Sequence, residues 1–182
     1  MRKITQQEFD NFEIDEFGYK ICPTGDYSLI EHFGERCSFG EWCSFGECCS
    51  FGERCSFGEG CSFGEWCSFG EGCSFGEGCS FGERCSFGEG CSFGEWCSFG
   101  ERCKIENGYT LLDFLKFEGF GSKKRCTYFF LTDQGIFIRC GCFSGFIEDF
   151  INKVRETHGE NKHGREYLML ANIAKTHFET EE

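Results

Sequence analysis

The stretch that decides the fold is CSFGEWCSFGECCSFGERCSFGEG, residues 37–60, which holds four copies of one hexapeptide. Phenylalanine recurs at every sixth position from Phe33 to Phe99, so twelve such hexapeptides follow one another. Six residues of an α-helix turn through about 600°, so these phenylalanines would not share one side of a helix. In a strand, the Cys and Phe of Cys-Ser-Phe lie on one side and Ser on the other. The pattern therefore predicts a short strand and a Gly-Glu-x corner, in which the repeat glycine, the one after each phenylalanine, supplies backbone freedom.

A repeated strand and corner makes a coil and not a hairpin sheet. Written from phenylalanine, Phe-Gly-Glu-x-Cys-Ser resembles the hexapeptide of left-handed β-helices, in which an apolar residue, a Gly or acidic residue and a small residue hold fixed places. Phenylalanine replaces the usual aliphatic residue. The resemblance covers residues 33–104 and implies a triangular turn of three hexapeptides, hence about four turns.

The flanking segments do not repeat. Thr5 and Glu8 have the spacing of a helix capping box, so a short helix carrying Phe9 and Phe12 is expected, followed by a brief strand at residues 19–22. We expect a mainly β fold with three parts: an N-terminal cap over residues 1–32, the hexapeptide-repeat β-helix over 33–105 and a small C-terminal α+β domain over 106–182.

The C-terminal part is predicted to place two helices on one side of a short antiparallel sheet. Strands are expected at residues 109–117, 125–131 and 135–139, with a hairpin turn between the last two. Helices are expected at about 146–157 and 164–178, where apolar residues recur at helical spacing.

The C-terminal part also carries a resemblance of its own. The segments YFF at 128–130, GIFIRCGCFSG at 135–145 and ETHGENKH at 156–163 resemble a C-terminal domain that recurs in uncharacterised proteins of bacteriophages and prophages. The resemblance implies a phage origin and assigns no activity.

The net charge of the chain limits the kinds of partner that it can be expected to bind. The formal net charge is −13, which argues against binding of nucleic acid or anionic membrane through the overall field and favours a basic partner. No apolar run approaches the ~18 residues that span a bilayer, and MRKITQQEFDNF lacks the apolar centre of a signal peptide. We expect a soluble, intracellular protein. Because the 17 cysteines are odd in number and most follow the repeat, they are expected to be reduced thiols, and those of the Cys-Ser-Phe strands are expected to pack in the interior.

Stacked turns would align the repeated glutamates in three external columns. Four turns rise about 19 Å, which gives one carboxylate per about 1.6 Å, close to the ~1.7 Å per charge of duplex DNA. The columns are therefore interpreted as a mimic of nucleic-acid charge, and the alternative is an acidic face that keeps a repeat soluble. The candidate partner-binding carboxylates are Glu35, Glu41, Glu47, Glu53, Glu59, Glu65, Glu71, Glu77, Glu83, Glu89, Glu95 and Glu101.

The variable position x distinguishes the three corners of a turn. Tryptophan is enriched at interfaces, so Trp42, Trp66 and Trp96 are candidate contact residues, unless they merely shield neighbouring turns. Trp42 and Trp96 share one corner and are the first choice. Cys48 occupies a variable position and is expected to be an exposed thiol.

Other chemistry is less well supported by the residues. Cys140, Cys142, His158 and His163 are four possible zinc ligands, but core cysteines and surface histidines are the favoured interpretation. The basic cluster at residues 123–125 is expected to be a solvated turn. No metal, cofactor or catalytic residue is expected.

The expected function is a non-catalytic phage protein that inhibits a host defence nuclease, of anti-CRISPR or anti-restriction type. Its partner would be a Cas nuclease or restriction complex in the cytoplasm of the infected bacterial host, with no direct contact to nucleic acid or membrane and with a possible homodimer formed through the C-terminal domain. One alternative is a hexapeptide-repeat acyltransferase, whose family needs a histidine base. His32 is the only histidine near the repeat, and no inserted loop interrupts it. A structural phage component is the other alternative.

Overall fold

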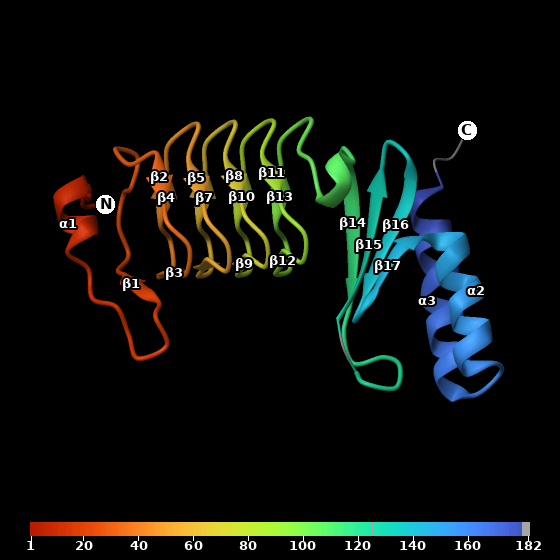
Figure 1. Ribbon diagram of the computed structural model, residues 1–182. Coiled ribbons are helices and arrows are strands. Elements are labelled where there is room, and N and C mark those ends of the chain that lie inside the picture. Colours follow the sequence, from red (N-terminus) through yellow and green to blue (C-terminus); the bar gives the residue numbers. More distant parts are fainter. Residues whose placement is uncertain (125, 180–182) are drawn as a thin grey trace. The chain divides into compact units, whose positions relative to one another are not determined.

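The computed structural model describes residues 1–124 and 126–179. It forms two compact units, Met1–Tyr109 and Thr110–Glu182, which are described separately below (Figure 1).

The first unit is a β-solenoid of about four turns, drawn from red to green in Figure 1. Its strands are β1 Lys20–Cys22, β2 His32–Phe33, β3 Cys37–Phe39, β4 Ser44–Phe45, β5 Ser50–Phe51, β6 Ser56–Phe57, β7 Ser62–Phe63, β8 Ser68–Phe69, β9 Ser74–Phe75, β10 Ser80–Phe81, β11 Ser86–Phe87, β12 Ser92–Phe93 and β13 Ser98–Phe99. They form three parallel sheets, ordered β1-β3-β6-β9-β12, β4-β7-β10-β13 and β2-β5-β8-β11. Each repeat strand from β2 to β10 pairs with the strand 18 residues further on, as Ser38 does with Ser56.

The interior of the solenoid consists of phenylalanine and cysteine, as the alternation predicts. The phenylalanines from Phe33 to Phe93 are at most 5% exposed, whereas Phe99 in the last turn is partly exposed. Rings one turn apart stack, and Phe39 lies 5.1 Å from Phe57 at an interplanar angle of 2°. Rings on neighbouring strands meet edge to face, as Phe39 and Phe45 do at 4.9 Å. Each ring contributes about 1.5–3 kcal/mol through burial, and each aromatic pair adds ~0.5–1.5 kcal/mol.

The repeat glycine is required for a different reason from the one predicted. The expectation that it supplies backbone freedom at the corner is wrong, because the left-handed backbone conformation falls on the variable position instead, with φ 58° at Arg54 and 66° at Gly60. The repeat glycine instead allows two turns to approach each other. A Cβ atom at Gly64 would lie 2.7 Å from the carbonyl carbon and oxygen of Gly46 in the preceding turn.

A non-glycine residue at a variable position should therefore cost stability. We expect Arg54→Gly to raise the free energy of unfolding by about 1 kcal/mol, because glycine adopts φ 58° without the steric penalty that other residues pay. Urea denaturation of the two proteins measures this difference. Gly78→Ala is the matched reverse change, since an added Cβ there meets nothing within 4 Å, and it should lower stability by a similar amount. Equal stability of all three proteins would contradict the assignment of strain to this position.

The N-terminal segment continues the aromatic interior of the solenoid. Helix α1, Gln6–Asp10, begins with the capping box predicted for Thr5 and Glu8. Its Phe9 meets Phe33 edge to face at 5.2 Å. Tyr27 is fully buried and stacks on Phe45 at 5.4 Å, one turn before that ring. At the N-terminal end of the solenoid, the stacked phenylalanines are therefore covered by buried aromatic side chains of the cap and are not exposed to solvent.

The second unit is an antiparallel sheet with two helices on one face. Strands β14 Leu111–Phe117, β15 Thr127–Thr132, β16 Gly135–Cys140 and β17 Phe143–Phe146 lie in sequential order, and the helices are α2 Ile147–His158 and α3 Lys162–Phe178. Phe129 and Ile138 of the sheet share a buried cluster with Phe150 and Leu170 of the helices. The three expected strands and both helices are present, although Arg125, where one strand was expected to begin, lies outside the described residues. Strand β17 was not predicted.

No helix in the described part of the chain combines the length and the apolar character that crossing a membrane requires.

Candidate protein-interaction surface

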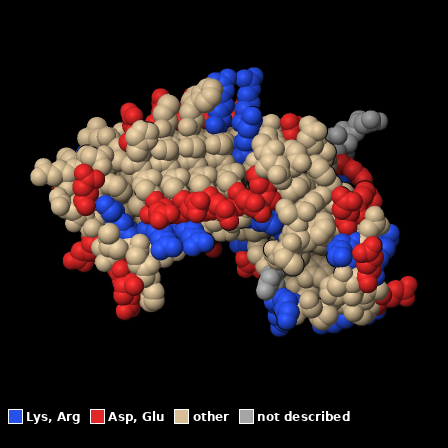
Figure 2. Space-filling model, viewed as in Figure 1, with Lys and Arg blue, Asp and Glu red and all other residues tan. Residues whose placement is uncertain are grey.

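The twelve repeat glutamates lie at the corners of the solenoid with exposed side chains. The backbone fixes the positions of the nine from Glu53 to Glu101, because the carbonyl of each accepts the N–H of the variable residue one turn earlier, as Glu53 does from Arg36 at 2.8 Å. Figure 2 shows one resulting row of acidic side chains along the solenoid, with basic side chains beside it. The columns are Glu35, Glu53, Glu71 and Glu89; Glu41, Glu59, Glu77 and Glu95; and Glu47, Glu65, Glu83 and Glu101.

These carboxylates have no partner within the described residues. No side-chain oxygen of the twelve takes part in an ion pair or a hydrogen bond there, although four arginines occupy variable positions of the same turns. Stacked carboxylates one turn apart repel each other by up to about 1 kcal/mol in water. A partner that carries positive charge would relieve that repulsion.

The three corners differ in their compensating charge. The Arg36 corner has Arg36, Arg54, Gly72 and Gly90 at its variable positions, and the Cys48 corner has Cys48, Trp66, Arg84 and Arg102. Each of these two corners therefore has two arginines beside four glutamates. The third corner, here called the tryptophan edge, has Trp42, Gly60, Gly78 and Trp96 beside Glu41, Glu59, Glu77 and Glu95. It is the corner whose repeats contain no cation.

The three tryptophans have different surroundings. Trp42 lies over the next turn, since a Cβ atom at Gly60 would be 2.5 Å from its ring. Nothing lies within 4 Å of the corresponding point at Gly78, and Trp96 is 81% exposed. Trp66, on the Cys48 corner, is exposed on one side and has the guanidinium of Arg84 over its ring, 4.6 Å from the ring centroid. The tryptophan edge therefore has two exposed indole rings, whereas the Cys48 corner has one.

The cysteine columns pack inside the solenoid as free thiols. Cys61 and Cys79 are fully buried, and each sulfur donates to a glycine carbonyl of the preceding turn at 3.4 Å. Hydrogen bonding to the thiols of Cys43 and Cys79 raises the pKa of Cys61, and burial raises it further. The Cys61 thiol therefore stays protonated at neutral pH. Cys48 is exposed, as expected.

The raised pKa of Cys61 predicts a loss of stability at alkaline pH. Unfolding exposes thiols whose pKa is about 8.5, so the unfolded chain ionises first and stability falls as the pH rises above that value. We expect the urea midpoint to decrease between about pH 7.5 and 9.5. The variant Cys61→Ala should show a shallower decrease, because it removes one titrating group. A midpoint that is constant over this range would contradict the prediction.

The four possible zinc ligands are not arranged as a metal site in the described residues. No group of three or more His, Cys, Asp or Glu side chains in the described residues is placed to hold a metal ion. His163 instead lies 3.3 Å from Glu166, and the ring of His158 packs on that of Tyr167. Lys123 and Lys124 lie in an exposed turn, and the third member of this basic cluster, Arg125, lies outside the described residues.

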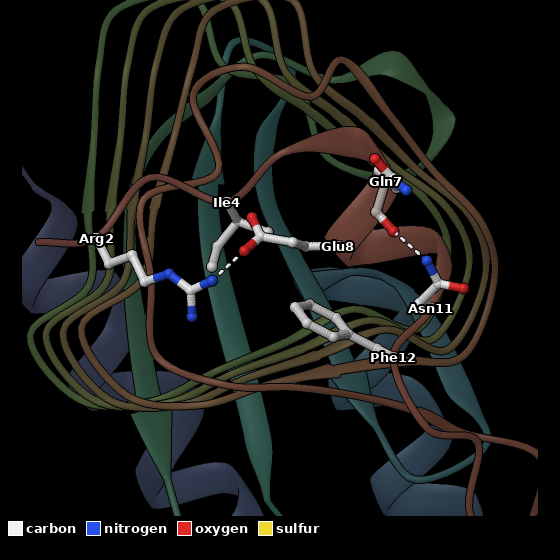
Figure 3. Close-up of a pocket in the computed structure, with 6 residues that line it drawn as sticks. All are labelled: Arg2, Ile4, Gln7, Glu8, Asn11 and Phe12. Atoms are coloured by element: carbon white, nitrogen blue, oxygen red, sulfur yellow. Dashed lines mark hydrogen bonds and ion pairs between the residues drawn. The ribbon is translucent and has the colours of Figure 1, made fainter.

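The cap contains a pocket of about 340 Å³ whose polar groups serve the capping structure. Figure 3 shows Arg2 and Glu8 facing each other across it, where they form an ion pair. Glu8 also accepts the backbone N–H and the hydroxyl of Thr5, and these hydrogen bonds hold the pKa of Glu8 below its usual value. Asn11 donates to the carbonyl of Gln7. These contacts anchor the start of α1 and leave no free nucleophile in the pocket.

Comparisons with protein-family models, curated proteins and solved structures give no match. The interpretation of this surface therefore rests on its own residues. That the tryptophan edge has no cation can be read from the sequence, provided that the variable positions are grouped by the corner to which they belong.

Proposed function

We propose that the protein is a non-catalytic interaction protein whose acidic solenoid occupies the basic groove in which a partner protein normally holds nucleic acid. The observation that carries this proposal is the tryptophan edge. It presents four exposed carboxylates without a cation, together with two exposed aromatic side chains. Arginine and lysine side chains of a nucleic-acid site complement both features, because carboxylates pair with them and indole rings attract cations.

The mimicry concerns charge density and not the spacing of individual phosphates. Successive carboxylates in one column are one turn apart, about 4.8 Å, whereas phosphates of one DNA strand are ~3.4 Å apart along the axis. The three columns together approach the density of a duplex, with one carboxylate per about 1.6 Å against ~1.7 Å. A groove lined with long, adaptable Lys and Arg side chains tolerates such a difference in spacing.

The two sequence resemblances, of the hexapeptide and of the C-terminal segment, make the proposal more specific. The hexapeptide supports a left-handed, triangular β-helix, and the C-terminal segment supports a phage origin. The partner is then a host defence nuclease, a Cas nuclease or restriction complex, met in the cytoplasm of the infected bacterium. The C-terminal unit would form a homodimer or dock on the partner.

Acyl transfer is the less supported alternative. His32 pairs with the hydroxyl of Ser50 at 2.7 Å on an exposed strand position. The turns carry no inserted loop that would hold an acyl carrier.

Affinity capture from a nuclease-treated bacterial lysate tests the proposal. Wild-type protein should retain a nucleic-acid-binding protein, which added duplex DNA or raised salt then releases. Retention of proteins that neither bind DNA nor respond to it would overturn the proposal. Detection of the protein in purified virions would favour a structural component instead.

A further inference from the structure

The C-terminal unit contains a pocket of about 310 Å³ that the proposed function does not use. It lies between the turn that joins β16 to β17 and the helices α2 and α3. Its walls are largely aromatic: Phe143 packs on Phe150 with ring centroids 5.4 Å apart, and Phe150 meets Tyr167 edge to face at 5.8 Å. Lys153 and His158 add two basic side chains to the lining.

Two thiols from one tight turn line this pocket. Cys140 ends β16 and pairs with Phe143 at the start of β17, so Gly141 and Cys142 form a two-residue turn in which Gly141 has φ 62°. Each peptide unit spans about 3.8 Å between Cα atoms, and the bend of a turn brings its first and third residues within the ~4.4–6.8 Å that a disulfide bridges. Both cysteines are free thiols, Cys142 exposed and Cys140 half-buried.

Two hydroxyl groups interact with the thiol of Cys140. Thr127, fully buried on β15, donates its hydroxyl to this sulfur at 3.2 Å. The hydroxyl of Tyr167 interacts with the same thiol, and burial, with Cys140 as a further cause, raises the pKa of Tyr167 to about 12. Tyr167 therefore remains a protonated donor at neutral pH. Both hydroxyls can therefore donate to the sulfur of Cys140 while it takes part in thiol–disulfide exchange.

We propose that Cys140 and Cys142 form a redox-active dithiol that reduces low-molecular-weight disulfides at the mouth of this pocket. The inference is independent of the acidic solenoid, since it concerns only residues of the second unit.

The exchange proceeds in two substitutions at sulfur. The exposed Cys142 thiolate attacks one sulfur of the small disulfide, whose S–S bond breaks, and the first small thiolate leaves and takes the proton that Cys142 lost. The Cys140 thiolate then attacks the sulfur of Cys142. The mixed disulfide breaks, and the second small thiolate leaves with the proton of Cys140. The protein loses two electrons and two protons and gains one S–S bond, while the small disulfide becomes two thiols.

Peptide mapping of the full-length protein tests the proposal with oxidised glutathione as the probe. Trypsin cleaves after Arg139 and Lys153, so Cys140 and Cys142 fall in one peptide that contains no other cysteine. Incubation of reduced protein with the probe, followed by alkylation in denaturant, should yield this peptide two hydrogens lighter and without alkyl groups. The reaction should be at least about tenfold faster than oxidation of the buried solenoid cysteines.

Three variants separate the proposal from unspecific oxidation. Cys126→Ser, outside the pocket, should leave the rate unchanged, and Cys140→Ser should stop at a glutathione adduct on Cys142. Thr127→Val removes the donor to Cys140 and should slow the second step about threefold or more. In wild-type protein, a persistent adduct on Cys142 with Cys140 still open to alkylation would overturn the proposal, as would full alkylation of both thiols.

Discussion

Gly64→Ala is expected to lower the free energy of unfolding of the solenoid by about 3 kcal/mol. An added Cβ would lie 2.7 Å from the carbonyl carbon and oxygen of Gly46 and 2.8 Å from the amide nitrogen of Glu47. These atoms belong to the backbone of the preceding turn, to which Gly64 donates its N–H, so neither side has room to move. Relief of the clash requires separation of two hydrogen-bonded turns. Urea denaturation, followed by circular dichroism, measures the loss.

Gly34→Ala is the matched control for this prediction. Gly34 occupies the same place in its hexapeptide, but an added Cβ there meets nothing within 4 Å. Its effect should stay within about 0.5 kcal/mol. Equal destabilisation by both substitutions would mean that glycine serves backbone freedom at this position, as the sequence first suggested, and not the spacing of turns.

Replacement of the four glutamates of the tryptophan edge by glutamine is expected to weaken binding to the captured partner about 100-fold. The variant is Glu41→Gln, Glu59→Gln, Glu77→Gln and Glu95→Gln. Each exposed ion pair is worth about 0.5–1 kcal/mol, and no cation beside these carboxylates compensates for them in the free protein. Isothermal titration at fixed salt concentration measures the affinity.

A second quadruple variant keeps the change in net charge the same. It carries Glu35→Gln, Glu53→Gln, Glu71→Gln and Glu89→Gln, on the corner that includes Arg36 and Arg54. We expect its affinity to fall less than about tenfold, because this corner already contains repulsive cations. If both variants lose affinity equally, binding depends on total charge and the tryptophan edge has no special role.

The sequence was sufficient to predict the solenoid, because its repeat allows few alternatives. A period of six excludes a helical stripe, and Cys-Ser-Phe permits one assignment of inside and outside, which the buried Phe39 and Cys37 confirm. The corner was harder to predict. Glycine is favoured both where the backbone is left-handed and where two backbone segments approach closely. Only the structure shows that Gly64 is needed for the close approach of two turns, whereas the left-handed conformation falls on Arg54.

The candidate surface, too, was predicted from the sequence only in part. Stacking by 18 residues predicted the carboxylate columns, and Glu53 lies where the register requires. The contact of Trp66 with Arg84 depends on side-chain rotamers, which a sequence pattern does not fix. Strand β17 was missed because its sequence, Phe-Ser-Gly-Phe, is short and adjoins the helical pattern of α2.

The most direct test of the central claim is a competition between this protein and duplex DNA for the purified partner. Fluorescence anisotropy of a labelled duplex bound to that partner is followed as the protein is added. Occupation of the nucleic-acid groove predicts complete displacement of the duplex, with an apparent dissociation constant that rises in proportion to the DNA concentration. A ternary complex, in which the duplex stays bound while the protein saturates the partner, would contradict the claim.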